Sequence, residues 1–229
     1  MCGRFLVTSP GQRIAEFFDL LEVPEWTPRY NIAPSQEVGT VVGLPDKERS
    51  FAVRRWGLIP AWAKESSIGN RLINARSETA AEKPAFRSAF AKRRCLVPVD
   101  GFYEWSPRSR GHTPYCFRHR DGEMLAIAAL WESWTAPGGG EVESFALLTT
   151  EANAVVRRVH GRMPALLARD QFDTWLDPEN DRVPVLQRLL VPSATPWLKA
   201  QPVGSFVNDP RHDGTRCLEA LRPDQAGLF

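Results

Sequence analysis

Five short runs between Cys95 and Thr150, punctuated by turn residues, constrain the fold of this chain more than any other feature. The runs are Cys95–Val99, Phe102–Ser106, Tyr115–Arg120, Met124–Trp134 and Ser144–Thr150. Turn residues stand at Pro107–Gly111, Asp121-Gly122 and Pro137–Gly140, and this pattern predicts β-strands. Strands and helices are mixed without βαβ alternation, which indicates an α+β fold. We expect one domain with a largely antiparallel, barrel-like mixed sheet flanked by short helices.

The other expected elements flank this strand-rich region. Ser9 and Pro10 predict a helix start, as N-cap and first helical residue. Apolar residues then recur with helical spacing and would form one apolar stripe along this helix: Ile14, Phe17, Phe18 and Leu21. Val38–Leu44 and Arg49–Trp56, separated by Pro45-Asp46, predict a hairpin. Further helices are expected over Thr79–Arg94, Glu151–Val159, Arg169–Leu176 and Val185–Val191. The polar segment 209–229 is expected to be a partly disordered tail, which leaves 1–208 as the domain.

Composition excludes several classes of protein. The 229 residues suit one domain, and no apolar run of about 18 residues predicts a membrane span. The N-terminus lacks the basic and apolar regions of a secretory signal, so we expect the cytosol. The cysteines, Cys2, Cys95, Cys116 and Cys217, form no CxxC pair and predict neither a disulfide framework nor a zinc site. The net charge of +2 permits an anionic partner without indicating one.

Cys2 follows the initiator methionine directly. Removal of Met1 would give Cys2 a free α-amine beside its thiol, a 1,2-aminothiol that no internal residue supplies. An α-amine titrates at about 7.7–8.0, against about 10.4 for lysine, so part of it is nucleophilic at neutral pH. The amine can condense with an aldehyde to an imine, which the thiol closes to a thiazolidine. Alternatively, the thiolate attacks an acyl group with the amine as base. The simpler interpretation is a cysteine that stands at a frayed terminus by accident.

Three other residues complete a candidate catalytic set with Cys2. Asn74 is an orienting amide, and Glu104 and His160 are candidate acid/base groups, since imine chemistry needs protons delivered and removed. Three arginines lie two residues from a member of this set, and their guanidinium groups suit phosphates. They are Arg4, Arg76 and Arg162.

Each candidate also has a structural interpretation. Asn74 could satisfy the backbone of a loop. Glu104 alternates with Tyr103 and Trp105, so it would be solvated if their face of the strand is core. A histidine after a helix, such as His160, is often a C-cap.

Six segments resemble the SRAP (SOS response-associated peptidase) family, whose members are also called abasic-site processing proteins. They are CGRF at 2–5, YNIAP at 30–34, WGLIPAW at 56–62, NARSET at 74–79, RRCLVPVDGFYEW at 93–105 and HGRMPALL at 160–167. The resemblance implies the family's α+β domain, binding of single-stranded DNA and covalent capture of abasic sites. By this resemblance Cys2 attacks the ring-opened sugar aldehyde, Asn74 positions the N-terminus or the sugar, and Glu104 and His160 transfer protons.

The resemblance also implies how DNA is bound. The DNA-binding residues would be Arg4, Asn31, Pro34, Trp62, Arg76, Trp105 and Arg162. The arginines would hold phosphates and the tryptophans would stack on bases, although Trp62, like Trp56, is most simply explained as a core residue. We expect a cytoplasmic monomer without metal or cofactor, with single-stranded DNA containing abasic sites as its partner and no contact with membranes.

Two rival functions remain open from the sequence. An N-terminal-nucleophile cysteine peptidase or amidase would use Cys2 with His160 as base and would not need the three arginines. A non-catalytic single-strand binding module would use the arginines and aromatics, would bind reversibly and would not need Cys2. The family name itself implies peptidase activity or self-cleavage, and a lyase reaction through the imine is compatible with the same residues.

Overall fold

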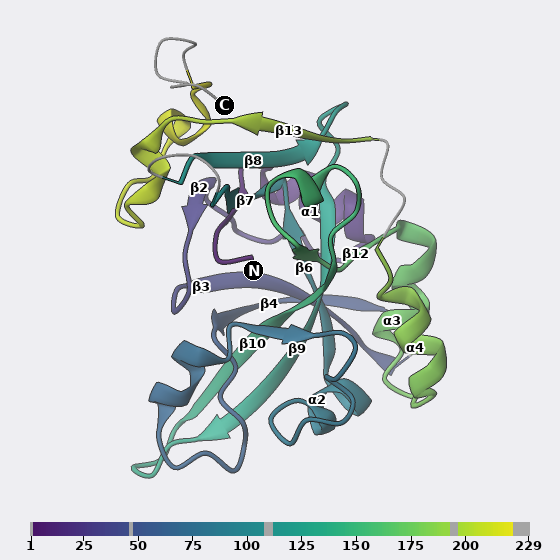
Figure 1. Cartoon of the computed structure of the whole chain (residues 1–229). Coiled ribbons are helices and arrows are strands. Elements are labelled where there is room, and N and C mark those ends of the chain that lie inside the picture. The colour runs from purple at the N-terminus through teal and green to yellow at the C-terminus, as the bar shows by residue number, and fades with distance from the viewer. Residues whose placement is uncertain (1, 46–47, 108–111, 193–196, 222–229) are drawn as a thin grey trace.

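Five strands close into a barrel at the centre of the fold (Figure 1). They are β3 (Glu37–Gly43), β4 (Arg49–Trp56), β6 (Arg94–Val99), β9 (Leu125–Thr135) and β10 (Glu141–Glu151). The computed structural model describes residues 2–45, 48–107, 112–192 and 197–221. Neighbouring strands in the ring are antiparallel except β4 and β10, which are parallel. The predicted α+β fold with a largely antiparallel, barrel-like sheet is confirmed.

Short strands extend the barrel and form a second sheet above it in Figure 1. β5 (Asn74–Arg76) and β11 (Arg162–Pro164) pair with β10, and β12 (Leu166–Leu167) pairs with β9. The second sheet has the order β13-β8-β7-β1-β2. Its strands are β1 (Phe5–Val7), β2 (Arg29–Ile32), β7 (Gly101–Trp105), β8 (Pro114–His119) and β13 (Leu198–Pro202). The five predicted strands of the middle region and the β3–β4 hairpin are therefore all present, while the shorter strands were not predicted.

The α-helices are short and lie outside the barrel (Figure 1). They are α1 (Gly11–Phe18), α2 (Arg87–Lys92), α3 (Phe172–Leu176) and α4 (Val183–Leu189). α3 continues a 3₁₀ turn at Arg169–Gln171, so the predicted helix 169–176 is confirmed, and α4 starts two residues before its predicted position.

The first helix differs from its prediction at both ends. Pro10 is the N-cap, and Ser9 instead donates its hydroxyl proton to a carboxylate oxygen of Asp100 at 2.6 Å. The helix ends at Phe18 because Asp19 adopts a left-handed conformation, with φ of 52°. Leu21 therefore lies beyond the helix and is exposed, so its assignment to the apolar stripe was wrong.

Two predicted helices are largely absent. Residues 77–86 form successive turns, and only Arg87–Lys92 is α-helical, since Pro84 has no N–H for a helical ladder. The predicted helix over 151–159 is reduced to a 3₁₀ turn at Val156–Arg158, because β10 continues to Glu151. The side chain of Asn153 then accepts hydrogen bonds from the backbone N–H groups of Val155 and Val156.

The C-terminal segment folds back onto the second sheet. Residues Ser205–Asn208 and Thr215–Leu218 form 3₁₀ turns, and Cys217 is buried in a small cluster with Tyr103 and Val203. Residues 209–221 of the predicted tail thus have defined structure, and its last eight residues, 222–229, lie outside the described ranges. None of the helices in the described ranges is long and apolar enough to cross a membrane.

Candidate active site

The first strand carries the N-terminus into the middle of the second sheet. β1 lies between β2 and β7, and the backbone N–H of Tyr103 donates to the carbonyl of Arg4 at 2.9 Å. Cys2 is fully buried, and its thiol points toward the carbonyl of Arg4, with the sulfur 3.8 Å from that oxygen. The pairing of β1 with β7 therefore places Cys2 beside the strand that carries Glu104.

Asn74 reaches the same place from the barrel. β5 runs parallel to β10, with Asn74 opposite Leu147. Its side-chain N–H donates to the carbonyl of Cys2 at 2.8 Å. The amide oxygen Oδ1 is buried and accepts no hydrogen bond from any residue in the described ranges. A buried acceptor without a donor is unusual in folded proteins, so Oδ1 is available to a group that enters the site.

Glu104 and His160, the candidate acid/base residues, lie close together. Glu104 is 4% exposed, so the interpretation of a solvated strand residue is wrong. One carboxylate oxygen lies 4.0 Å from Nδ1 of His160. The ring of His160 is oriented by Arg162, whose backbone N–H donates to Nδ1 at 3.0 Å. Burial raises the pKa of Glu104 above its usual value, an effect that the chain's terminal ammonium group and His160 oppose.

Both Cys2 and Glu104 are held toward their neutral forms. Burial raises the pKa of the Cys2 thiol well above its usual range, and Glu104 in its ionised form raises it further. A neutral thiol is a weak nucleophile and a poor initiator of acyl transfer. A carboxyl group with a raised pKa retains its proton at higher pH and can donate it.

Arg4 and Trp105 form one wall of the site, supported by the C-terminal segment. The guanidinium carbon of Arg4 lies 5.6 Å from the ring centroid of Trp105, within the range of a cation–π contact. Arg4 also donates to the side chain of Asn31 at 2.8 Å and to the carbonyl of Val207 at 2.9 Å. The indole N–H of Trp105 donates to the side chain of Asn208 at 2.7 Å.

Asn31 lies behind Arg4 and is only 1% exposed. Its amide N–H groups face the carbonyls of Val207, Asp209 and His212 at 2.8–3.2 Å. The structure therefore gives Asn31 a supporting place, because its hydrogen bonds hold Arg4 and the 207–212 segment instead of facing the surface.

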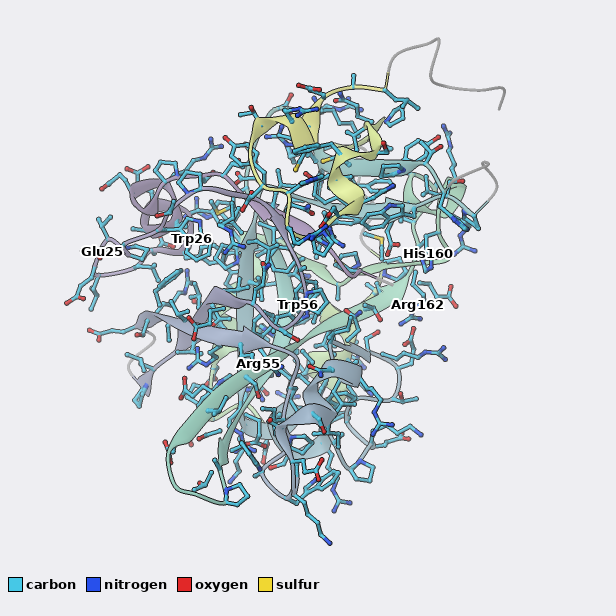
Figure 2. All side chains as sticks on the ribbon, turned by 90° about the vertical axis from the view of Figure 1, so that its left-hand side faces the viewer. Glu25, Trp26, Arg55, Trp56, His160 and Arg162 are labelled. Carbon is cyan, nitrogen blue, oxygen red and sulfur yellow. The ribbon has the colours of Figure 1, made fainter. Side chains whose placement is uncertain are left out.

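The other two arginines lie on β5 and β11, two short strands that pair with β10. Arg76, on β5, is exposed and makes no side-chain hydrogen bond to the part of the chain that the structure describes. Arg162, on β11, donates to both carboxylate oxygens of Glu78 at 2.5 and 2.9 Å and to the carbonyl of Thr149 at 2.5 Å. Figure 2 shows His160 and Arg162 together, well away from Glu25 and Trp26.

Trp62 stands on the surface next to Asn74. It is 60% exposed, so its interpretation as a core residue was wrong, whereas Trp56 is buried. A cavity of about 460 Å³ lies between Trp62, Asn74 and Arg76. Pro34 is half-buried in the turn between β2 and β3 and is not among the residues that line this cavity.

Comparison with known protein families identifies one family. A family model described as SOS response associated peptidase (SRAP) matches residues 1–210. The chain belongs to the SRAP family. The predicted resemblance is thereby confirmed.

Several SRAP relatives share most of its length. Abasic site processing protein YoaM of Bacillus subtilis is 38% identical over 224 residues, which cover 96% of this chain and 98% of YoaM. Abasic site processing protein HMCES of Gallus gallus is 31% identical, over 85% of this chain and 68% of HMCES. A crystal structure of a Bacteroides thetaiotaomicron protein superposes with a TM-score of 0.84 at 26% identity, covering 96% of this chain and all of that protein.

Some residues of this SRAP site were not expected from the sequence. Glu78 lies within the quoted NARSET segment, yet only its pairing with Arg162 shows that it reaches the site. Asn208 and the carbonyl of Val207 lie about 200 residues from Arg4 along the chain, and they support the wall formed by Arg4 and Trp105. For Glu78, the available indication was its place in the NARSET segment, two residues after Arg76.

Proposed function

We propose that this protein binds single-stranded DNA and captures abasic sites covalently through Cys2, as part of the DNA damage response. Its relatives YoaM and HMCES are named abasic site processing proteins. The observation that carries the proposal is the convergence of Cys2, Asn74, Glu104 and His160 from four separate strands and loops. The proposed acting form is a cytoplasmic monomer.

The proposed chemistry starts with removal of Met1, which frees the α-amine of Cys2. The amine adds to the aldehyde carbon of the ring-opened deoxyribose and gives a carbinolamine, which loses water to form an imine. The thiol sulfur then bonds to the imine carbon while its proton passes to nitrogen, and a five-membered thiazolidine results. The product has the summed mass of protein and DNA less one water. Closure by sulfur makes the adduct durable, since an imine alone hydrolyses readily.

Three residues support these steps. Glu104, whose pKa is raised by burial, donates a proton to the departing hydroxyl of the carbinolamine. His160 accepts the proton that the attacking amine releases, and its 4.0 Å distance from Glu104 allows the two groups to share the transfer. Asn74 fixes the Cys2 carbonyl and offers its unoccupied Oδ1 to the amine or to a sugar hydroxyl.

The DNA would run from the wall formed by Arg4 and Trp105 to the strands that carry Arg76 and Arg162. Arg4, Arg76 and Arg162 would hold the phosphates that flank the lesion. Trp105 and the exposed Trp62 would stack on bases. Pro34 and Asn31 would contribute to the same path, the latter through Arg4.

The peptidase alternative is less well supported by the thiol environment. A cysteine peptidase needs a thiolate, whereas burial raises the pKa of the Cys2 thiol. An imine needs only the amine for its first step, and the thiol is consumed later as an intramolecular partner. Peptidase or autoprocessing activity and an abasic-site lyase reaction are secondary proposals that use the same residues.

The test is intact-mass analysis after incubation with a single-stranded oligonucleotide that carries one abasic site. The wild-type protein is expected to lack Met1 and to give a denaturant-stable species at the summed mass less one water. Cys2→Ser should lose this species and retain DNA binding, while Cys116→Ala, which changes a buried thiol elsewhere, should still form it. A durable adduct in Cys2→Ser would overturn the thiazolidine mechanism.

The rival functions give different results in the same assay. Loss of Met1 with no adduct, combined with turnover of peptide substrates, would favour the peptidase. Salt-dependent and fully reversible binding without an adduct would favour the non-catalytic module.

A further inference from the structure

Arg162 does not present an open guanidinium to the surface. Its Nη1 and Nη2 groups donate to the two carboxylate oxygens of Glu78 at 2.5 and 2.9 Å. This is a bidentate pair, the geometry in which arginine also holds a phosphate. Glu78 therefore occupies the position that a phosphate would need.

The remaining N–H groups of Arg162 offer no second bidentate edge. Nη2 also donates to the carbonyl of Thr149 at 2.5 Å, and Nε is buried without a partner among the described residues. A guanidinium has two pairs of parallel N–H groups, and Nη2 belongs to both. Since Nη2 is already shared between Glu78 and Thr149, a phosphate can bind bidentately only after Glu78 has left.

The two partners differ in how easily they can move. The side chain of Glu78 is 46% exposed, whereas that of Arg162 is 19% exposed. Arg162 is also anchored by Thr149 on the neighbouring strand β10. Rotation of Glu78 into water gives up its pair with Arg162 and the hydrogen bond from its own backbone N–H. The bond to Thr149 keeps the arginine in place during the exchange of carboxylate for phosphate.

We propose that Glu78 is a specificity-determining residue that competes with DNA phosphate for Arg162. The inference rests on the proposed function, because it concerns the same DNA-binding face. Every strand that binds must displace Glu78 and then lie close to its negative charge. Reversible binding of intact DNA is weakened by this competition, whereas a strand that is captured covalently at Cys2 is retained despite it. Glu78 thus favours release of undamaged strands.

The replacement of the Glu78 carboxylate by a phosphate does not involve the proposed catalytic residues His160 and Glu104. His160 is oriented by the backbone N–H of Arg162, and not by its guanidinium. Displacement of Glu78 therefore leaves the arrangement of His160 and Glu104 unchanged.

The test is a fluorescence-anisotropy titration with an unmodified single-stranded oligonucleotide. Glu78→Gln keeps the shape of the side chain and removes its charge. We expect binding about 3- to 5-fold tighter than that of the wild type, the upper part of the range for an exposed ion pair. Glu82→Gln is the matched control, because Glu82 is an exposed glutamate four residues away on the same segment. It should change the affinity by about twofold or less, through net charge alone.

A double-mutant cycle locates the effect at Arg162. In an Arg162→Ala background, Glu78→Gln should tighten binding no more than Glu82→Gln does, because the contested guanidinium is gone. Equal gains in Glu78→Gln and Glu82→Gln, weaker binding in Glu78→Gln, or a gain beyond that of Glu82→Gln that persists without Arg162 would each overturn the inference.

The experiments distinguish failure of the proposed function from failure of the Glu78 inference. If the wild type binds DNA reversibly but forms no adduct with an abasic oligonucleotide, covalent capture is wrong, and the comparison of Glu78→Gln with Glu82→Gln still decides the competition. If the wild type binds no DNA, both the proposed function and the role of Glu78 are overturned.

Discussion

The side-chain amide of Asn74 donates a hydrogen bond of 2.8 Å to the backbone carbonyl of Cys2, which precedes it by 72 residues. This bond joins the two sheets, since Asn74 lies on the extended barrel and Cys2 leads into the second sheet. It also fixes the direction in which the α-amine of Cys2 would emerge after loss of Met1. The position of Cys2, the proposed nucleophile, therefore depends on a single side chain.

Asn74→Ala should lower the rate of adduct formation by about 100-fold, because small displacements of a reacting group cost about that much. The affinity for unmodified single-stranded DNA should change little. Asn70→Ala is the control, since Asn70 is exposed and bonds instead to Ser35 and Arg55. Quenched time points resolved by denaturing gel give the rates. An unchanged rate in Asn74→Ala would show that the amide is not needed to place Cys2.

Glu104→Gln should lower the rate of adduct formation by about 10²- to 10⁴-fold, the usual contribution of a general acid. Burial raises the pKa of Glu104, so its carboxyl keeps a proton to higher pH than an exposed glutamate does. The wild-type rate should therefore rise with pH as the amine deprotonates and then fall as Glu104 loses its proton. Rates measured from about pH 5 to about pH 9 test this. The falling limb should be absent in Glu104→Gln, and its persistence there would assign the acid to another group.

The longer elements of the fold follow from the sequence because they repeat a pattern over enough residues. β4 and β9 each have eight or more residues, which is long enough for strand composition and flanking turns to be recognised. β5 and β11 have three residues each and exist because β10 lies beside them. No local pattern predicts such strands, since their hydrogen bonds come from tertiary contacts.

The candidate site also contains residues that the sequence indicates and contacts that only the folded chain reveals. Cys2 stood out because of its chemistry, and the other three candidate catalytic residues, Asn74, Glu104 and His160, were chosen by residue type and family resemblance. Their convergence depends on contacts between segments tens of residues apart, which a single sequence does not encode visibly. The pairing of Glu78 with Arg162 spans 84 residues, so it became evident only from the folded chain.

The buried thiols predict how stability changes with pH. Burial raises the pKa of both Cys95 and Cys116 to about 12, whereas a thiol in the unfolded chain titrates near about 8.5. Between these values the folded state binds more protons than the unfolded state, so the free energy of unfolding falls as pH rises. Each thiol contributes a slope of about 1.4 kcal/mol per pH unit there and none well below pH 8.5.

Urea unfolding at about pH 8 and about pH 10 measures this loss. The double variant Cys95→Ala/Cys116→Ala should lose less stability between the two pH values than the wild type does, whatever its stability at the lower one. Equal losses in both proteins would show that the thiols are not protected from titration by burial.

Trp62→Ala tests whether the exposed indole beside Asn74 binds a base. Stacking on an aromatic side chain contributes about 1–3 kcal/mol per base, so the affinity for single-stranded DNA should fall at least about fivefold. Because Trp62 is uncharged, the slope of log affinity against log salt should stay the same. Arg76→Ala should instead reduce that slope by about 0.7, the value for one phosphate contact on a single strand. Val53→Ala, which shortens another exposed apolar side chain, is the control and should match the wild type. If Trp62→Ala binds like Val53→Ala, no base of the DNA stacks on Trp62.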